Sequence, residues 1–284
     1  MPEPIESTPI EIAPALPRPA LPGTVIARES PEDLVDAIAA DLFFQAAACV
    51  RAFGDFHLAL SGGSTPEPLY ARLMYDPAYR SLPWKRTHLW VVDERRVPFD
   101  DERSNFRMIR DTLVDHSDIP PEQVHPMPAT ADDADALYEA QLREHLGWRD
   151  KGHDRLDFVV LGMGADGHTA SLFPRSPALD AEGRLVVLND GPTVVPPPRI
   201  TMTLPFLNAS RFLGVMLTGE KKRATVARVI ASRGSRAAST EARIRELPIT
   251  GLSPLAGELR WYLDRAACPP ENPQINAQRS NDRV

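Results

Sequence analysis

The sequence predicts an α/β fold in which a mostly parallel sheet is covered by helices on both faces. Short apolar runs of strand length alternate along the chain with longer amphipathic segments, and this alternation is typical of parallel sheets. Glycine-containing turns follow several apolar runs directly, so polar side chains would gather where those strands end. The chain has 284 residues, of which 43% are hydrophobic, which is enough for one large domain or two small ones.

The individual elements follow from this alternation. Strands are assigned to the apolar runs and helices to the segments with one apolar face, and a helix can begin at Pro66 because proline is favoured in a first turn. The predicted strands are Thr24–Arg28, His57–Leu60, Thr87–Val92, Leu156–Leu161, Arg184–Leu188, Arg199–Thr203, Phe212–Leu217 and Trp261–Asp264. The predicted helices are Pro31–Phe53, Pro66–Met74, Asn105–Val114, Asp132–Leu146 and Lys221–Ala231. The segment Ser232–Arg245 lacks strong periodicity and is predicted to be a solvated loop.

Composition argues against several classes of protein. The net charge is −7 and the basic residues are scattered, which disfavours a general nucleic-acid surface. No apolar run reaches the length of a membrane-spanning helix, and the N-terminus lacks the basic and apolar regions of a signal peptide. Cys49 and Cys268 lie far apart and match neither a metal site nor a disulfide framework. These features predict a cytoplasmic protein that binds neither nucleic acid nor membranes.

Both ends of the chain have the composition of tails. Residues 1–22 are rich in proline, and residues 269–284 are polar with almost no apolar side chains. Neither stretch can bury enough apolar surface to offset the entropy lost on ordering. The sequence therefore predicts one folded region, residues 23–268, between two disordered tails.

A glycine-rich segment from Gly162 to Pro174 directly follows the apolar run that ends at Leu161. It would place Asp166 and His168 at the C-terminal edge of the sheet, where ligands bind in open α/β folds. Histidine is suited to proton transfer near neutral pH, and a nearby carboxylate can orient or tune its ring. We interpret the segment as a catalytic loop, and the alternative is a glycine turn with a structural histidine.

The same segment contains the dinucleotide-binding pattern G-x-G-x-x-G, at Gly162, Gly164 and Gly167. That pattern requires a long helix that begins at the glycines. Pro174 and Pro177 would stop such a helix early, because proline lacks the N–H group and clashes in a helix interior. The pattern is therefore weak evidence for a dinucleotide.

A second motif, Ser61-Gly62-Gly63-Ser64-Thr65-Pro66, joins the strand ending at Leu60 to a helix. Backbone N–H groups and the dipole at a helix N-terminus favour an anion, and Ser64 or Thr65 could cap the helix. A phosphate would need positive partners. Arg199 and Lys222 stand at the ends of apolar strands and could converge on it. The alternatives are a plain serine-glycine turn and two solvated cations.

Charged residues end a further apolar run in Asp93-Glu94-Arg95, and Ser104 and Asn105 follow shortly after. At the end of a strand these side chains would again lie at the ligand edge of the sheet. A surface cluster of ion pairs is the competing interpretation.

In this order the four segments resemble the 6-phosphogluconolactonase family, which is related in fold to the glucosamine-6-phosphate deaminases. The resemblance covers residues 23–267, including the ending Trp261–Ala267. It implies a doubly wound, modified Rossmann-like α/β fold of the deaminase/lactonase type. The implied activity is hydrolysis of 6-phospho-D-glucono-1,5-lactone to 6-phosphogluconate in the oxidative pentose phosphate pathway. No metal or organic cofactor is implied, and the expected partner of this monomer or small homo-oligomer is the sugar-phosphate lactone.

The resemblance also suggests roles for single residues. His168 matches the presumed general base of the family and Asp166 its neighbouring carboxylate. A δ-lactone is an activated ester, so water deprotonated by His168 could attack it directly, with Arg95 as a donor to the oxyanion and Asp93 nearby. The expected phosphate ligands are Ser61, Gly62, Gly63, Ser64, Thr65, Arg199 and Lys222.

Two other functions are weighed against the lactonase. The deaminases carry a glutamate five positions beyond the matching histidine, where this chain has Phe173, although Asp93 matches their proton-transfer carboxylate. Phenylalanine cannot carry a proton, so the deaminase set is incomplete. A sugar-phosphate sensor would usually carry a DNA-binding helical module, and neither tail is long or apolar enough to form one. The sequence therefore predicts a lactonase.

Overall fold

A computed structural model describes residues 16–234 and 239–270 of the chain. Its main sheet has seven strands in the order β1-β10-β9-β6-β2-β3-β5, and all neighbours in it are parallel. Because the strands are parallel, their carboxyl ends lie at one edge. The strands are β1 Thr24–Arg28, β2 Phe56–Leu60, β3 Thr87–Val91, β5 Val124–His125, β6 Phe158–Leu161, β9 Phe212–Leu217 and β10 Glu258–Asp264.

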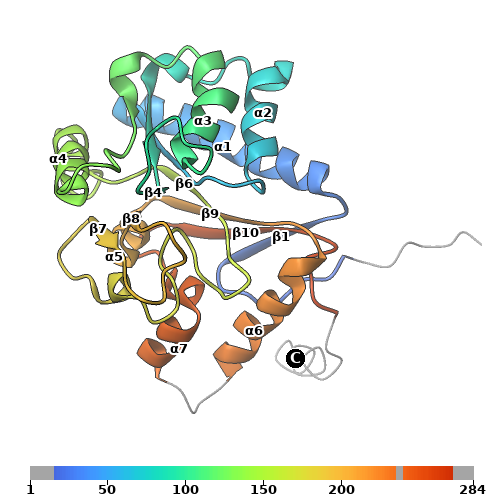
Figure 1. Cartoon of the computed structure of the whole chain (residues 1–284). Helices are drawn as coiled ribbons and strands as arrows, with labels where there is room; N and C mark the ends of the chain where they lie inside the picture. The colour runs from blue at the N-terminus through green and yellow to red at the C-terminus, as the bar shows by residue number, and fades with distance from the viewer. Residues whose placement is uncertain (1–15, 235–238, 271–284) are drawn as a thin grey trace, which may run out of the picture.

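Helices cover both faces of this sheet, with α1, α2 and α3 on one side and α6 on the other (Figure 1). The predicted doubly wound α/β fold is therefore confirmed. The helices are α1 Pro31–Phe53, α2 Glu67–Tyr75, α3 Asn105–Thr112, α4 Ala134–Leu146, α5 Leu204–Ala209, α6 Arg223–Gly234 and α7 Thr240–Glu246.

Three strands form a second, antiparallel sheet in the order β4-β8-β7, with β4 Asp93–Arg95, β7 Val186–Asn189 and β8 Arg199–Met202. The sequence predicted the strands that became β7 and β8 but not that they leave the parallel sheet. The apolar pattern of a short strand does not specify the direction of its partner, so only the tertiary structure decides this.

Helix α1 shows how local signals fix an element. Ser30 and Asp33 form a capping box, in which each side chain accepts a hydrogen bond from the other residue's backbone N–H, and Pro31 occupies the first turn. At the other end, Gly54 takes the left-handed conformation (φ 93°) that favours glycine after a helix. Both ends agree with the prediction because the start and stop signals lie in the sequence itself.

One predicted loop is partly wrong. Residues 232–234 of the segment Ser232–Arg245 belong to α6 and residues 240–245 to α7. Ser239 caps α7 by accepting a hydrogen bond from the N–H of Ala242. Ile244 packs against the main core, so tertiary contact supports a helix of seven residues that is too short to show a period. Residues 235–238 lie outside the described part of the chain.

The range predicted as an N-terminal tail contains residues that contact the folded body. Leu21 is only 9% exposed, and the carbonyl of Pro22 accepts a hydrogen bond of 2.7 Å from the indole Nε1 of Trp261. Leu16 also packs against the core. Residues 1–15 and 271–284 of the two predicted tails lie outside the described residues.

Two truncations should therefore behave differently. Removal of residues 1–15 should leave the unfolding temperature and the activity unchanged. Removal of residues 1–22 should lower the free energy of unfolding by about 2–3 kcal/mol, since it also removes the burial of Leu21 and the bond to Trp261. Thermal unfolding of both variants tests this, and a loss of activity of more than a few-fold on removal of residues 1–15 would contradict it.

Glu139 links α4 to the second sheet. Its carboxylate accepts hydrogen bonds from Arg143 and Arg184 and from the N–H of Leu185 just before β7. Burial alone would raise the pKa of Glu139, but these hydrogen bonds outweigh it and lower the pKa to about 2. The contact therefore stabilises the fold above the ordinary carboxyl range and is lost as the pH falls toward that value.

Replacement Glu139→Gln should lower the free energy of unfolding near pH 7 by about 1.5–3 kcal/mol, the range for hydrogen bonds to a charged group. The difference between wild type and variant should narrow as the pH falls from 6 toward 3, because the wild-type carboxylate then takes up a proton that the amide cannot. Urea unfolding at several pH values measures both effects. A difference that is independent of pH would show that the charge of Glu139 does not contribute.

Candidate active site

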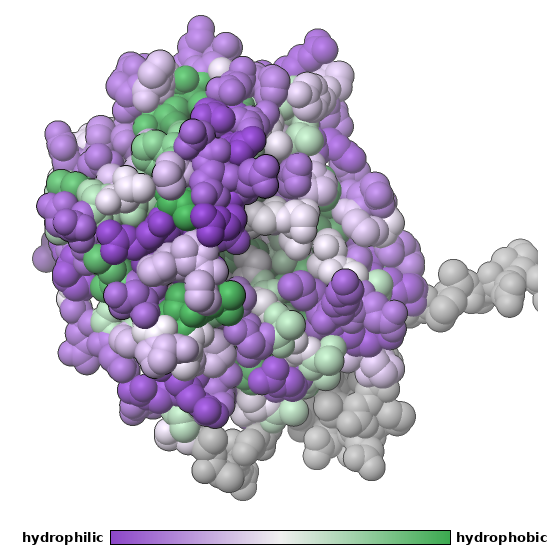
Figure 2. Space-filling model, in the orientation of Figure 1, coloured by the Kyte–Doolittle hydropathy of each residue, from purple (hydrophilic) through white to green (hydrophobic). Residues whose placement is uncertain are grey.

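A polar pocket of about 410 Å³ lies at the carboxyl ends of β2, β6 and β9 and beside the second sheet. It opens on the face seen in Figure 2, which is hollowed near its centre. The predicted site residues that line it are Ser61, Gly62, Gly63, Ser64, Thr65, Asp93, Arg95, His168, Arg199 and Lys222. The structure thus brings all four sequence segments to one pocket.

The glycine-rich loop Gly162–Pro174 is held in place by hydrogen bonds within the loop. The N–H of Gly164 donates to the carbonyl of His168 at 2.8 Å, and the hydroxyl of Thr169 donates to the carbonyl of Gly162 at 2.9 Å. A Cβ atom at Gly164 would lie 2.2 Å from the ring of His168, so only glycine fits there. The next helical element is a 3₁₀ turn at Pro177–Asp180, not the long helix that a dinucleotide fold requires.

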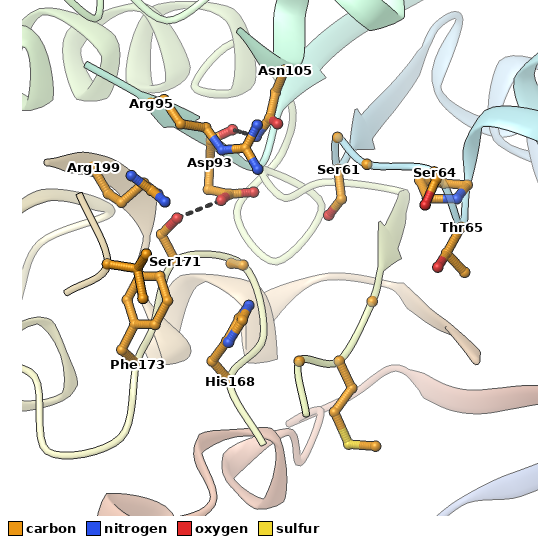
Figure 3. A pocket seen from close by; sticks show the side chains of 18 of the residues that line it. Ser61, Ser64, Thr65, Asp93, Arg95, Asn105, His168, Ser171, Phe173 and Arg199 are labelled. Atoms are coloured by element: carbon orange, nitrogen blue, oxygen red, sulfur yellow. Dashed lines mark hydrogen bonds between the residues drawn. The ribbon is translucent and has the colours of Figure 1, made fainter. Parts of the chain in front are cut away.

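His168 and Asp166 form a hydrogen-bonded pair. The Nδ1 atom of His168 lies 2.6 Å from Oδ1 of Asp166, and the opposite edge of the ring faces the pocket (Figure 3). Burial alone would raise the pKa of Asp166, but the hydrogen bond and charge of His168 outweigh it and lower the pKa. Asp166 therefore stays ionised, holds a proton on Nδ1 and leaves Nε2 free to accept one. It acts from behind the histidine and does not itself line the pocket.

The loop after β2 has the features of an anion site. The backbone N–H groups of Gly63, Ser64 and Thr65 have no hydrogen-bond acceptor among the described residues. Gly63 has a φ of 101°, and a Cβ at Gly62 would lie 2.0 Å from Oδ1 of Asn105. Gly63 is therefore favoured by its backbone conformation and Gly62 by the close approach of the Asn105 side chain, and the N–H groups are left to bind a ligand or water.

The expected capping of α2 is wrong. The N-cap position is occupied by Pro66, and neither Ser64 nor Thr65 makes a side-chain cap. The carbonyl of Pro66 accepts from the N–H groups of Leu69 and Tyr70, which closes the first turn without either hydroxyl. Both hydroxyls thus remain available at the pocket, at the positive end of a nine-residue helix.

The two predicted phosphate cations occupy different parts of the pocket. Lys222 is half-buried beyond β9, and its Nζ donates to the carbonyl of Met163 at 2.6 Å. Arg199 instead pairs with Arg95 across β4 and β8, and its guanidinium lies 5.7 Å from the ring centre of Phe173. Figure 3 shows Arg199 and Arg95 at one end of the pocket and Ser64 and Thr65 at the other, with His168 between them. The structure does not bring Arg199 to the serine-glycine loop.

The two arginines lie side by side, so this end of the pocket holds two positive charges. Burial and the neighbouring charge of Arg95 both lower the pKa of Arg199, although an arginine stays protonated. Among the described residues that line the pocket, Asp93 supplies the carboxylate, and it accepts a hydrogen bond of 2.5 Å from the hydroxyl of Ser171. With two arginines and one carboxylate, this end of the pocket has a net positive charge, which can stabilise negative charge that develops on a ligand.

Glu94 does not belong to the pocket. It is 1% exposed, and its carboxylate accepts from the N–H groups of Asn105 and Phe106 and from the hydroxyl of Ser104. It thereby anchors the N-terminus of α3, where a carboxylate is favoured by the helix dipole. Of the three charged residues Asp93, Glu94 and Arg95, the first and the last therefore line the pocket, and Glu94 lies beneath it.

Several pocket residues were not predicted as site residues, namely Met163, Ser171, Phe173, Val195 and Asn105. Ser171 and Phe173 lie within the glycine-rich loop Gly162–Pro174, so their position in that motif was the available signal. Asn105 is buried, donates to the carbonyl of Asp93 at 2.7 Å, and leaves its Oδ1 without a partner among the described residues. Val195 belongs to no sequence motif, and only the structure identifies it as a pocket residue.

Known proteins with a related sequence carry the same fold. The family model for glucosamine-6-phosphate isomerases/6-phosphogluconolactonase matches residues 29–261. The human GDH/6PGL endoplasmic bifunctional protein is 40% identical over 252 residues, which cover 84% of this chain and 30% of that protein. This chain therefore spans less than a third of that relative's length.

Two shorter relatives are matched over most of their length. The 6-phosphogluconolactonase of a Synechocystis species is 37% identical over 75% of this chain and 84% of its own length. The solved structure of 6-phosphogluconolactonase from Trypanosoma cruzi superposes with a TM-score of 0.71 at 26% identity, covering 87% of this chain and 96% of that one. The chain thus belongs to the glucosamine-6-phosphate isomerase/6-phosphogluconolactonase family.

Proposed function

We propose that the protein hydrolyses 6-phospho-D-glucono-1,5-lactone to 6-phospho-D-gluconate, the activity for which its relatives from Synechocystis and Trypanosoma cruzi are named. The observation that carries the proposal is the pair of His168 and Asp166, which presents Nε2 to a pocket that also contains an anion site. General-base activation of water needs a fixed, unprotonated ring nitrogen, and the ionised carboxylate of Asp166 favours this tautomer.

The reaction can proceed without a covalent intermediate. Nε2 of His168 takes a proton from a water molecule, and the resulting hydroxide attacks the lactone carbonyl to give a tetrahedral oxyanion. The bond from the carbonyl carbon to the ring oxygen then breaks, and the departing oxygen takes the proton back from His168. The products are a hydroxyl group and a carboxylic acid, which loses its proton to solvent.

The two charged ends of the pocket suggest how the substrate lies. In the proposal, the loop Ser61–Thr65 and Lys222 hold the 6-phosphate through backbone N–H groups, hydroxyls and one positive charge. Arg95 and Arg199 then face the lactone end and stabilise the oxyanion and the new carboxylate. Arg199 is thus moved from the phosphate, where the sequence placed it, to the reacting carbonyl, with Asp93 and Ser171 beside it.

The isomerase half of the family requires more acid/base groups than this pocket contains. Opening an amino-sugar ring and moving protons between two carbons needs a glutamate in addition to the histidine pair and a carboxylate such as Asp93. The position that supplies it in the deaminases is Phe173, which lines the pocket with an aromatic ring. This supports lactone hydrolysis over deamination.

A lactonase assay on the purified chain tests the proposal directly. The substrate should be generated in place from glucose-6-phosphate, and the rate of spontaneous hydrolysis should be subtracted. We expect rapid turnover of the phosphorylated lactone and no release of ammonia from glucosamine-6-phosphate. Turnover of the amino sugar without lactone hydrolysis would reverse the assignment.

The remaining biological properties are also proposals. In the described part of the chain no helix combines the length and the apolar composition needed to cross a membrane. We propose a cytoplasmic enzyme that acts as a monomer or small homo-oligomer on a small sugar phosphate, with a catalytic domain over residues 23–268. The contacts of Leu16 and Leu21 with the core suggest that the functional unit begins slightly before this domain.

A further inference from the structure

Four of the seven histidines gather at one place remote from the pocket. His57, His88 and His125 lie on one face of the sheet, because His57 pairs with His88 between β2 and β3 and Trp90 pairs with His125 between β3 and β5. His145, in the last turn of α4, packs against the same rings. His57 and His88 stand near the N-terminal ends of their strands, whereas the pocket lies at the carboxyl ends.

His57 has both ring nitrogens occupied. Its Nε2 lies 3.0 Å from a carboxylate oxygen of Asp55, and its Nδ1 accepts a hydrogen bond of 3.0 Å from the indole of Trp90. Asp55 in turn is paired with Arg149. Because the indole can only donate, Nδ1 of His57 is committed to it, and this part of the cluster is complete without a ligand.

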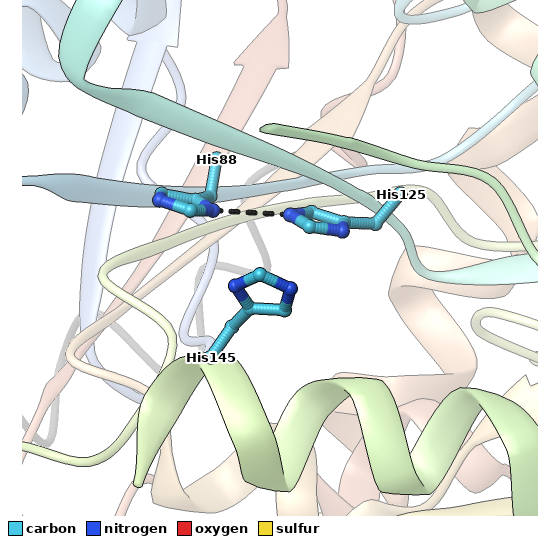
Figure 4. A group of neighbouring side chains, drawn as sticks. All are labelled: His88, His125 and His145. Carbon is cyan, nitrogen blue, oxygen red and sulfur yellow. Dashed lines mark hydrogen bonds between the residues drawn. The ribbon is translucent and has the colours of Figure 1, made fainter. Parts of the chain in front are cut away.

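The other three histidines are not satisfied in this way. Nδ1 of His88 and Nε2 of His125 lie 3.0 Å apart, so one of the two rings donates its proton to the other. Neither ring nitrogen of His145 has a hydrogen-bond partner among the described residues. Figure 4 shows the His145 ring directly beneath the His88 and His125 pair, and one nitrogen from each ring lies within 4.8 Å of the others.

We propose that His88, His125 and His145 form a binding site for a divalent transition-metal ion of the zinc type. Neutral imidazole is a preferred ligand of such ions, and the group contains no carboxylate that would favour magnesium or calcium. Two nitrogens bound to one zinc ion at 2.0–2.1 Å are about 3.3 Å apart, close to the separation of the first pair. On binding, the proton of the donor ring moves to that ring's other nitrogen, so that both facing nitrogens bind the ion; the three rings turn slightly toward it, and water takes the fourth position.

Two further features suit a cation at this place. His145 lies at the C-terminal end of α4, where the helix dipole carries partial negative charge. The ring of Trp90 stacks on His125 at 3.9 Å and contacts His145 edge-on, which keeps both rings close to the positions needed for binding. A bound ion would join α4 to β3 and β5, and its role would be structural because the lactone pocket lies at the other end of the sheet.

Zinc binding to the full chain tests the site. Calorimetric titration of metal-free protein with Zn²⁺ should give one ion per chain and a higher unfolding temperature, and Co²⁺ should give the visible absorption of a four-coordinate ion. His145→Phe keeps an aromatic ring against Trp90 but removes the nitrogens, and should weaken binding by about 100-fold or more, at least the loss seen when a residue supporting a ligand is removed. His116→Phe, which alters a histidine outside the cluster, is the matched control and should bind as wild type does.

The possible outcomes distinguish this histidine site from zinc bound in the lactone pocket. Equal zinc affinity of wild type and His145→Phe would overturn the proposal, as would the absence of zinc binding by the wild type. Binding that is lost in His168→Ala but kept in His145→Phe would place the ion in the lactone pocket and would likewise overturn it. Because the expected readouts are affinity, spectrum and unfolding temperature, a failed lactonase assay would leave this test unaffected.

Discussion

His168→Ala should lower kcat for lactone hydrolysis by about 10²–10⁴-fold, the range typical of removing a positioned general base. The change should leave the affinity for 6-phosphogluconate nearly unchanged, because the charged groups at both ends of the pocket remain. Steady-state kinetics and product inhibition measure the two effects. A folded His168→Ala protein with full activity would return the glycine loop to a purely structural role.

Asp166→Asn is the matched variant for this prediction. The asparagine amide can still form a hydrogen bond with the ring of His168. It neither fixes the proton on Nδ1 nor stabilises the positive charge that His168 gains during the reaction. We expect a smaller loss of kcat than for His168→Ala. Equal losses of kcat for the two variants would contradict this ranking.

Lys222→Ala should lower kcat/KM for the phosphorylated lactone by about ten- to a hundred-fold, which corresponds to about 1.5–3 kcal/mol for a charge-assisted hydrogen bond. The unphosphorylated lactone should be a poor substrate for the wild type. Its kcat/KM should be nearly unchanged by the substitution, since it lacks the group that Lys222 binds. The exposed neighbour Lys221 does not line the pocket, so Lys221→Ala is the control and should retain wild-type kinetics.

Arg199→Ala distinguishes the two ends of the pocket. If Arg199 faces the reacting carbonyl, its loss should lower kcat for both lactones by similar factors, because both develop the same oxyanion. A loss confined to the phosphorylated lactone would instead assign Arg199 to the phosphate, as the sequence alone suggested. Equal losses on both lactones for Lys222→Ala would show that Lys222 supports the fold and does not recognise the phosphate.

The sequence by itself determined the features that depend on neighbouring residues. The bounds of α1 follow from its capping box and its terminal glycine, and β9 follows from one uninterrupted apolar run. The pairing of Asp166 with His168 was predictable for the same reason, because the two residues are two positions apart and their hydrogen bond needs only the turn that the local glycines permit.

Only the tertiary structure decided which distant residues meet. Arg199 lies beside Arg95 and away from the serine-glycine loop because β8 pairs with β4 in a separate sheet, and no local pattern encodes that pairing. Glu94 and Asp93 are adjacent in sequence, yet they point to a helix end and to the pocket because successive strand residues face opposite sides. The histidine cluster likewise exists only through strand order and register, since His88, His125 and His145 come from three elements far apart in the chain.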